Sequence, residues 1–346
     1  MSKEQGPATR IGEGRSVLVV SNLRRDLPGW AESMAALKAS GLVVDDLGQA
    51  FDDSVLGEHI ESADALILAG TITLTGALLR RSRRLRIISK QGIGVDNIDV
   101  AAATELGIPV CNTAGSNAES VADHAIGLML AVCRQLCRLD ALTRAGEGWK
   151  VWPPPVEQLA GNTLAIIGTG NIGSRVARRA AAGFGMRVLA HDLIPNKGLE
   201  VAYGVRFAPI VEIVAEADLV TLHVPLTDDT RNLFDTTMLK LMRPSAILIN
   251  TARGGLVDET ALANALRSGQ IAGAGLDVFE IEPCTDSPLF GLDNVVLTPH
   301  SAGQSHESSV NGRMWSVENV LAALAGVHRN VVNPSVLEPQ GWDSRL

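Results

Sequence analysis

The glycine-rich segment Gly168-Thr-Gly-Asn-Ile-Gly173 constrains the fold of this chain more than any other feature. It directly follows an apolar run at residues 164–167 and opens a stretch with helical character. A second apolar run at residues 186–190 leads to Asp192, about twenty residues beyond the last glycine. The first glycine permits a tight turn, the second lets the backbone approach a pyrophosphate, and the third allows close helix packing. Together these features predict a dinucleotide-binding βαβ unit, with Asp192 on a ribose 2′-hydroxyl.

The position of this segment in mid-chain indicates a second domain. The chain has 346 residues, which is enough for two domains with separate cores. Short apolar runs alternate with helical patterns, which is typical of parallel sheets built from βαβ units. Further strands are expected at residues 17–20, 42–44, 65–69, 86–89 and 109–112, and at residues 219–224, 246–250, 274–278 and 295–298. The sequence therefore predicts an α/β protein with a compact first domain followed by a cofactor domain.

Two helical stretches need partner surfaces. Residues 121–136 are apolar on nearly all sides, which predicts a helix buried between domains or subunits, and residues 314–324 are amphipathic. Cys133 and Cys137 are spaced to share one face of the first helix, where buried thiols are favoured over a metal site. The prolines within residues 149–155 then end the helical pattern, and the cofactor domain starts beyond them.

Charge and composition exclude several functional classes. A net charge of −8 and an aromatic content of 3% oppose binding to nucleic acid or to an anionic membrane. No apolar run is long enough to span a bilayer, and residues 1–7 lack the apolar core of a signal peptide. The four cysteines show neither a disulfide nor a zinc pattern. We therefore expect a cytoplasmic protein that acts on a small molecule and holds no metal.

Three polar residues in the second half each follow an expected strand. They are Arg253, Glu282 and His300, and they lie where parallel α/β sheets bind ligands. An arginine there can hold a carboxylate through two parallel hydrogen bonds, and a histidine that faces a carboxylate can exchange a proton. Each residue has a structural alternative, namely a helix cap, a solvated turn residue or a hydrogen-bonded histidine. Their joint occurrence after the glycine segment favours a common catalytic cleft.

Several further motifs occur in order between about residues 65 and 334. They are Gly92-Ile-Gly-Val-Asp-Asn-Ile-Asp99, Asn117-Ala-Glu-Ser-Val-Ala-Asp-His124, His223-Val-Pro-Leu-Thr-Asp-Asp-Thr230, Thr251-Ala-Arg-Gly-Gly255, Gly275-Leu-Asp277, Glu282-Pro283 and Thr298-Pro-His300. With the glycine segment, they resemble the D-isomer-specific 2-hydroxyacid dehydrogenases, the family of phosphoglycerate, glyoxylate/hydroxypyruvate and D-lactate dehydrogenases. The resemblance implies two Rossmann-like doubly wound domains. A flavodoxin-like substrate domain, which is discontinuous, takes residues 1–112 and 304–346, and an NAD-binding Rossmann domain takes residues 113–303.

The resemblance also implies roles for the matching positions. Arg253 orients the carboxylate and carbonyl of the substrate, His300 exchanges the proton on the 2-oxygen, and Glu282 holds His300. Substrate contacts fall on Ile93, Gly94, Asn112, Arg253 and His300. Contacts with NAD fall on Gly168, Gly170, Asn171, Ile172, Asp192, Val224, Pro225, Thr230, Thr251, Ala252, Arg253, Asp277 and His300, with Asp277 at the nicotinamide amide.

The implied activity is hydride transfer between NAD(H) and a small 2-hydroxy or 2-oxo acid. An unphosphorylated acid of the glyoxylate or hydroxypyruvate type is favoured, because residues 69–73 lack the arginine that phosphoglycerate dehydrogenases carry there. Lys90 is the nearest local replacement, and it is a single point charge; Arg24 and Arg25 are more distant candidates. A D-3-phosphoglycerate dehydrogenase, and an NAD-sensing corepressor-like interaction protein of the same fold, are the alternatives.

The expected assembly is a homodimer. In the family that the chain resembles, the element matching the apolar helix lies at the two-fold contact between subunits. Trp149 and Trp152, just beyond this helix, either pack in the linker or reach the substrate cleft of the neighbouring subunit.

Overall fold

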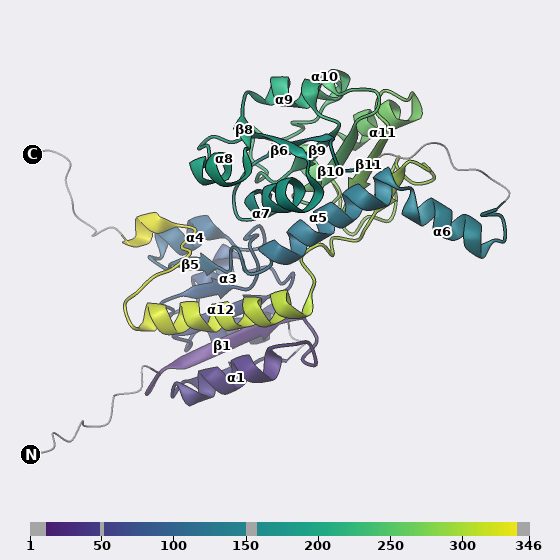
Figure 1. Ribbon diagram of the computed structural model, residues 1–346. Coiled ribbons are helices and arrows are strands. Elements are labelled where there is room, and N and C mark those ends of the chain that lie inside the picture. Colours follow the sequence, from purple (N-terminus) through teal and green to yellow (C-terminus); the bar gives the residue numbers. More distant parts are fainter. Residues whose placement is uncertain (1–11, 49–51, 150–157, 338–346) are drawn as a thin grey trace, which may run out of the picture. The chain divides into compact units, whose positions relative to one another are not determined.

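The computed structural model describes residues 12–48, 52–149 and 158–337, and the chain divides into two compact units (Figure 1). The first, here called the outer unit, is Met1–Asn117 with Ser305–Leu346, and the second, the central unit, is Ala118–Gln304. Each unit is built around a parallel sheet with helices on both faces. The predicted α/β class, with two doubly wound units of which one is discontinuous, is confirmed.

The sheet of the outer unit has the strand order β2-β1-β3-β4-β5, and every pairing is parallel. This is the order of flavodoxin-like folds. β3 is buried along its whole length, because helices cover both faces, and this is why the strand appears as a continuous apolar run. The strands are β1 (Ser16–Ser21), β2 (Val43–Asp46), β3 (Ala65–Ala69), β4 (Ile88–Lys90) and β5 (Val110–Asn112).

The helices of the outer unit form two layers. α1 (Trp30–Ala39) and α12 (His306–Leu324) pack on one face of the sheet, and α12 contains the predicted amphipathic stretch. The hydroxyl of Ser305 accepts a hydrogen bond from the backbone of Ser308 and so caps the first turn of α12. The other face is covered by α2 (Asp53–Ile60), α3 (Gly76–Leu79) and α4 (Val100–Glu105), and the described chain ends in a 3-10 turn, η3 (Pro334–Leu337).

The sheet of the central unit has the order β12-β11-β10-β9-β6-β7-β8, again with parallel pairings throughout. Read from β8, this is the strand order of dinucleotide-binding Rossmann folds with one strand added at the far edge. β8, a two-residue edge strand, was absent from the sequence prediction because so short a segment carries no periodicity. The strands are β6 (Thr163–Ile167), β7 (Arg187–His191), β8 (Arg206–Phe207), β9 (Leu219–Leu222), β10 (Ile247–Asn250), β11 (Gly273–Leu276) and β12 (Val295–Leu297).

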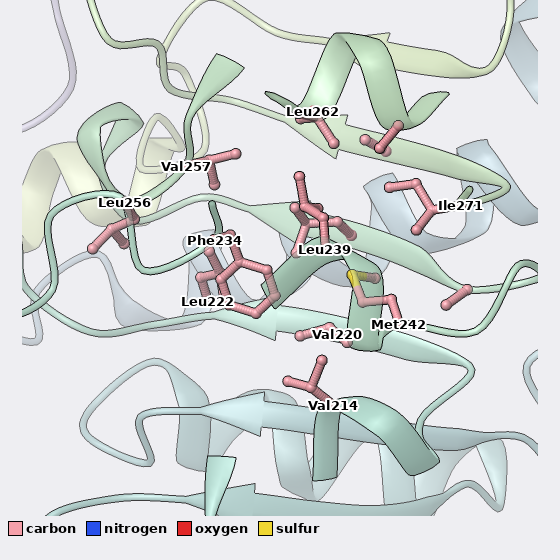
Figure 2. Packing of buried hydrophobic residues seen from close by; sticks show 14 of the residues in the cluster. Val214, Val220, Leu222, Phe234, Leu239, Met242, Leu256, Val257, Leu262 and Ile271 are labelled. Atoms are coloured by element: carbon pink, nitrogen blue, oxygen red, sulfur yellow. The ribbon is translucent and has the colours of Figure 1, made fainter. Parts of the chain in front are cut away.

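Two apolar cores lie on the two faces of this sheet. One is formed with α5 (Ala118–Cys133), α7 (Gly173–Arg178), the π-helical turn η1 (Arg179–Gly183) and α8 (Lys197–Tyr203). The other is formed with α9 (Ile210–Glu216), α10 (Thr236–Leu241), the 3-10 turn η2 (Gly254–Leu256) and α11 (Glu259–Arg267). Figure 2 shows the second core, in which Phe234 packs among side chains from β9, α10 and the η2 turn.

The apolar helix predicted at residues 121–136 is two helices. α5 ends at Cys133, Gln135 adopts a left-handed conformation with φ of 51°, and α6 spans Leu136–Arg144. A left-handed residue cannot continue a right-handed helix, so the chain changes direction there. Cys133 is therefore buried while Cys137 is exposed on the next helix, and the prediction that they share one face is wrong.

The structure bears on two other expectations, one about the tryptophans beyond α6 and one about membrane-spanning segments. Trp149 is 98% exposed, and Trp152 lies outside the described residues. Among the described residues, none of the helices has the length and apolar character that crossing a bilayer requires.

Candidate active site

The residues predicted to contact the cofactor lie at the carboxyl ends of the strands of the central sheet. Because all pairings in this sheet are parallel, these ends share one edge. The strand order reverses at β6, and ligands bind to doubly wound sheets at such a point. Gly168, Gly170, Asn171 and Ile172 follow β6, Asp192 follows β7, Val224, Pro225 and Thr230 follow β9, Thr251, Ala252 and Arg253 follow β10, Asp277 follows β11, and His300 follows β12.

The three glycines of the segment differ in what surrounds them. Gly168 has φ of 92°, and a side chain there would place a Cβ 2.6 Å from the carbonyl oxygen of His223. A Cβ on Gly173 would lie 1.9 Å from the carbonyl oxygen of Gly168, so helix and turn can approach only without a side chain. Gly170 has no atom within 4 Å of the corresponding position. The turn is therefore closed on the protein side and open at Gly170, as a site for a pyrophosphate requires.

Asp192 is tied to the glycine turn. One carboxylate oxygen accepts hydrogen bonds from the amide of Thr169 at 2.6 Å and from its hydroxyl at 2.8 Å, and the other accepts from the amide of Ile194 at 3.0 Å. Burial disfavours the charged carboxyl, but these hydrogen bonds outweigh it and hold the pKa of Asp192 below its ordinary value. An ionised carboxylate has about four acceptor positions, so one remains for a ligand hydroxyl. Thr169 was missed by the sequence analysis, because the residue between the first two glycines shows no pattern of its own.

The turns after β9 and β10 continue the same edge. The hydroxyl of Thr230 donates to the carbonyl oxygen of Pro225 at 2.7 Å, which closes the turn after β9. Val224 lies against Gly168, because a Cβ there would be 2.8 Å from a methyl group of Val224. The hydroxyl oxygen of Thr251 is buried without a hydrogen-bond partner among the described residues. A buried hydroxyl without a partner indicates a ligand atom at this position.

Arg253 and the segment that carries Glu282 come together through a close backbone contact. Arg253 directly precedes η2, and a Cβ on Gly254 would lie 1.9 Å from the carbonyl of Phe279. The Arg253 turn therefore packs directly on the backbone of the loop after β11. The side chain of Glu282 folds back on this loop, where one of its oxygens accepts a hydrogen bond from the amide of Phe279 at 3.0 Å.

Glu282 and His300 form a pair. The second carboxylate oxygen of Glu282 lies 2.6 Å from Nδ1 of His300, and the His300 side chain is 51% exposed. A carboxylate at Nδ1 fixes the hydrogen on that nitrogen, which leaves Nε2 for exchange with a ligand. The structure therefore brings Arg253, Glu282 and His300 to neighbouring turns of one sheet edge, in an arrangement suited to binding an anion and transferring a proton.

Asp277 contacts the His300 loop directly. It is buried, and its carboxylate accepts hydrogen bonds from the hydroxyl of Thr298 and from the amides of Ser301 and Ala302. The hydroxyl of Thr298 also lies 2.9 Å from Nε2 of His124, a residue of α5. Neither Thr298 nor His124 was assigned a role from the sequence, because residues so far apart in the chain show no local signal.

The predicted substrate loop lies in the outer unit, after β4. The side-chain amide of Asn112 donates to the carbonyl oxygen of Ile93 at 2.9 Å. The amide of Gly92 donates to the hydroxyl of Thr113 at 2.8 Å, and the amide of Thr113 returns a hydrogen bond to Gly92. Ile93 and Gly94 are thus presented on a loop that the last residue of β5, Asn112, and the next residue, Thr113, hold in place.

Lys90 immediately precedes this loop. It is 5% exposed, and its ammonium group donates to the carbonyl oxygen of Gly70 at 2.6 Å. Burial lowers the pKa of Lys90 to about 8, although Asp96 opposes the shift. Lys90 is therefore a buried residue that joins two loops.

Comparisons with known proteins identify relatives of this chain. The sequence model of the D-isomer specific 2-hydroxyacid dehydrogenase NAD-binding domain matches residues 126–302. A glyoxylate reductase from Korarchaeum cryptofilum is 42% identical over 296 residues, which cover 83% of this chain and 89% of that protein. The chain belongs to the D-isomer-specific 2-hydroxyacid dehydrogenase family. It is accordingly an NAD-dependent oxidoreductase.

Two further relatives place this dehydrogenase within the family. A D-3-phosphoglycerate dehydrogenase from Mycobacterium leprae is 41% identical over 275 residues, which cover 80% of this chain but 52% of that protein. The crystal structure of a glyoxylate reductase from Paecilomyes thermophila has a TM-score of 0.82 at 29% identity, with 93% of this chain and 99% of that chain covered.

Proposed function

We propose that this dehydrogenase reduces a small unphosphorylated 2-oxo acid, such as glyoxylate or hydroxypyruvate, with NADH. The observation that carries the proposal is the packing of the Arg253 turn on the loop whose Glu282 holds His300. An anion-binding cation and a proton donor on neighbouring turns are the two groups that reduction of a 2-oxo acid requires from the protein.

Each residue of the proposed site has a distinct role in the reduction. NADH supplies the hydride when bound. Arg253 holds the carboxylate of the oxo acid and stabilises the negative charge that develops on the 2-oxygen. His300, with Nδ1 on Glu282, donates a proton from Nε2 to that oxygen, and in the reverse direction the neutral ring accepts it. The loop of Ile93 and Gly94, held by Asn112, stays a predicted substrate contact of the outer unit.

The residues at the edge of the central sheet fit NAD(H). Gly170 leaves room for a pyrophosphate, Asp192 keeps one acceptor position for a ribose hydroxyl, and Thr251 has a buried hydroxyl in need of a partner. Since hydrogen bonds keep Asp192 ionised, it would repel the 2′-phosphate of NADPH. We therefore propose a preference for NADH.

The charges of the outer unit favour an unphosphorylated substrate. Lys90 is buried on the carbonyl of Gly70, Arg24 is paired with Asp26, and Arg25 is paired with Asp46. The cations considered for binding a phosphate thus already have partners. Several relatives at about 40% identity are named glyoxylate reductases, which agrees with this choice.

We further propose a cytoplasmic homodimer. Three cysteines, Cys111, Cys137 and Cys284, are free thiols, which is usual in the reducing cytoplasm. α6 has no buried residue, and a cavity of about 640 Å³ lies between it and the ends of β10, β11 and β12. A helix with apolar side chains beside an open cavity is a surface that a second copy would cover.

The substrate proposal is tested by competition at fixed NADH between hydroxypyruvate and its 3-phosphorylated analogue. We expect a higher kcat/KM for the unphosphorylated acid, and at least a tenfold lower kcat/KM when NADPH replaces NADH. A preference for the phosphorylated acid would assign the protein to phosphoglycerate metabolism instead. Absence of turnover with every small 2-oxo acid, despite tight binding of NADH, would favour the NAD-sensing alternative.

A further inference from the structure

A chain of hydrogen bonds runs from α5 to the loop of the catalytic histidine. Nε2 of His124 lies 2.9 Å from the hydroxyl oxygen of Thr298, and this hydroxyl donates to a carboxylate oxygen of Asp277 at 2.6 Å. All three residues belong to the central unit, although 174 positions separate His124 from Thr298. His124 itself lies six residues after the start of α5, whose apolar face is buried on the sheet.

The direction of each hydrogen bond follows from the number of available hydrogens. The carboxylate of Asp277 receives one hydroxyl and two amides, so it serves only as an acceptor. The Thr298 hydroxyl therefore donates its single hydrogen to Asp277. Its oxygen must then accept a hydrogen bond from His124. This assigns the ring hydrogen of His124 to Nε2 and makes His124 the donor that orients Thr298.

At its Asp277 end, this chain of hydrogen bonds fixes the backbone around His300. The oxygen of Asp277 that accepts the Thr298 hydroxyl also accepts the amide of Ser301 at 2.8 Å, and the other oxygen accepts the amide of Ala302 at 2.8 Å. The amide of His300 donates to the backbone carbonyl of Asp277 at 2.7 Å. His300 has φ of 50°, a left-handed conformation that an isolated histidine adopts rarely. Such a conformation persists only when surrounding contacts impose it.

We propose that His124 is a positioning residue for His300, acting through Thr298 and Asp277. The proposal rests on the proposed function, in which His300 transfers the proton. Without the donor from His124, the Thr298 hydroxyl is free to rotate away from Asp277, and the carboxylate loses one of the three contacts that orient it. The His300 loop then relaxes, and Nε2 of His300 moves from the position that it needs for proton transfer.

A role restricted to helix packing predicts something different. The His124 side chain is 25% exposed and does not belong to an apolar core, so its truncation removes little packing. A packing defect would lower thermal stability without changing the rate of the chemical step. A positioning defect lowers kcat far more than it weakens the binding of NADH, since most contacts predicted for the dinucleotide, Asp277 and His300 excepted, are made by other turns.

The test compares three variants of the full-length protein. His124→Ala removes the donor, His124→Gln keeps an amide donor at similar reach, and Asp123→Ala is the matched control. Asp123 neighbours His124 on α5, but it pairs with Arg179 rather than with Thr298 or Asp277. We expect His124→Ala to lower kcat roughly 10- to 100-fold with a much smaller change in the dissociation constant for NADH, and His124→Gln to recover most of the loss.

A double-mutant cycle then tests the route. If His124 acts through Thr298, the variant that combines His124→Ala with Thr298→Val should lose no more than the worse single variant. Losses that multiply would overturn the route, and an unchanged kcat in folded His124→Ala would overturn the proposal itself. Should His124→Ala fail to fold, His124→Gln takes its place, and the kcat of its combination with Thr298→Val is judged by the same criterion.

A measurement without substrate separates this proposal from the proposed function. In ¹⁵N-labelled protein, the amide signals of Ser301 and Ala302 should shift in His124→Ala and return in His124→Gln, and the ring of His124 should carry its hydrogen on Nε2. If the wild type reduces no 2-oxo acid, the substrate assignment fails while these signals still decide the role of His124. If the amide signals of Ser301 and Ala302 keep their wild-type chemical shifts in both variants, the positioning role is contradicted.

Discussion

The left-handed backbone of His300 connects its chemistry to its surroundings. A residue with a side chain reaches φ of 50° at a cost that neighbouring contacts must offset, and here Asp277 binds the next two amides. The imidazole is consequently held on Glu282 while half of its surface stays exposed. In the proposed function His300 needs a fixed orientation and access to substrate, and a loop whose amides are held by Asp277 is suited to both.

His300→Ala should lower kcat by roughly two to four orders of magnitude while NADH still binds, because it removes the proton donor and leaves the glycine turn intact. Steady-state kinetics and a fluorescence titration with NADH measure the two effects separately. His306→Ala, on the first turn of α12, is the control and should keep wild-type turnover. Comparable activity of His300→Ala and wild type would remove His300 from the mechanism.

Lys90 predicts a pH-dependent difference in stability. Its pKa falls to about 8 in the folded protein, against about 10.4 in an unfolded chain. Below pH 8 the folded protein carries the full unfavourable effect of the buried ammonium group. Between pH 8 and 10.4 only the unfolded chain keeps the proton, so stability due to this group rises with pH.

The free energy of unfolding of Lys90→Met should therefore compare best with that of the wild type near pH 7. As pH approaches 10.5, the free energy of unfolding of the wild type should rise relative to that of the variant by up to about 3 kcal/mol. Denaturant unfolding of both proteins at several pH values measures the difference, in which other titrating groups cancel. A difference in unfolding free energy that is constant over this window would show that Lys90 is not desolvated.

The turn between β10 and α11 shows how core packing supports the site. Phe234 is fully buried, its amide donates to the carbonyl oxygen of Leu256 at 2.9 Å, and it forms a bridge to Val257 (Figure 2). Leu256 ends the η2 turn that begins next to Arg253. The aromatic ring thus fills the core beneath the turn that carries the proposed anion-binding residue.

Phe234→Ala should lower the free energy of unfolding of the central unit by about 3–5 kcal/mol, because it leaves a cavity in a closed core. Phe290→Ala is the matched control, since this ring is 48% exposed, and it should change stability by about 0.5 kcal/mol or less. Chemical denaturation followed by circular dichroism measures both. Equal effects of the two substitutions would show that Phe234 does not support the core.

Assembly of the whole protein depends on α6 in our proposal. Leu136 is 52% exposed at the start of a helix without buried residues, and Figure 1 shows α6 standing apart from the sheet of the central unit. The cavity beside it is lined partly by apolar side chains, among them Val132, Leu142 and Leu292. These surfaces would be covered in a two-fold dimer.

Light scattering at micromolar concentration should therefore give twice the mass of one chain. Leu136→Asp should shift the protein toward monomers, because a carboxylate would be buried without a partner in the interface. Val201→Asp, at a 90% exposed position on α8, should leave the dimer unchanged. A monomeric wild type would refute the proposed assembly.

The sequence alone determined the features that depend on local chemistry. Strands covered on both faces appear as continuous apolar runs, so β3 and β6 were recognisable, and the glycine segment was recognisable because each glycine meets a local steric demand. Arg253, Glu282 and His300 were singled out because each comes a few residues after a strand, and parallel strands end on one edge; their catalytic roles stay a prediction.

Only the tertiary structure decided the features that depend on contacts between distant residues. The break at Gln135 has no glycine or proline to signal it, and the hydrogen bond from His124 to Thr298 spans 174 positions. The burial of Lys90 and the contacts of Asp277 depend on which loops meet at a sheet edge. Local sequence specifies the conformation of a segment, whereas the partners of a buried polar group are set when the whole unit packs, because only then is water excluded.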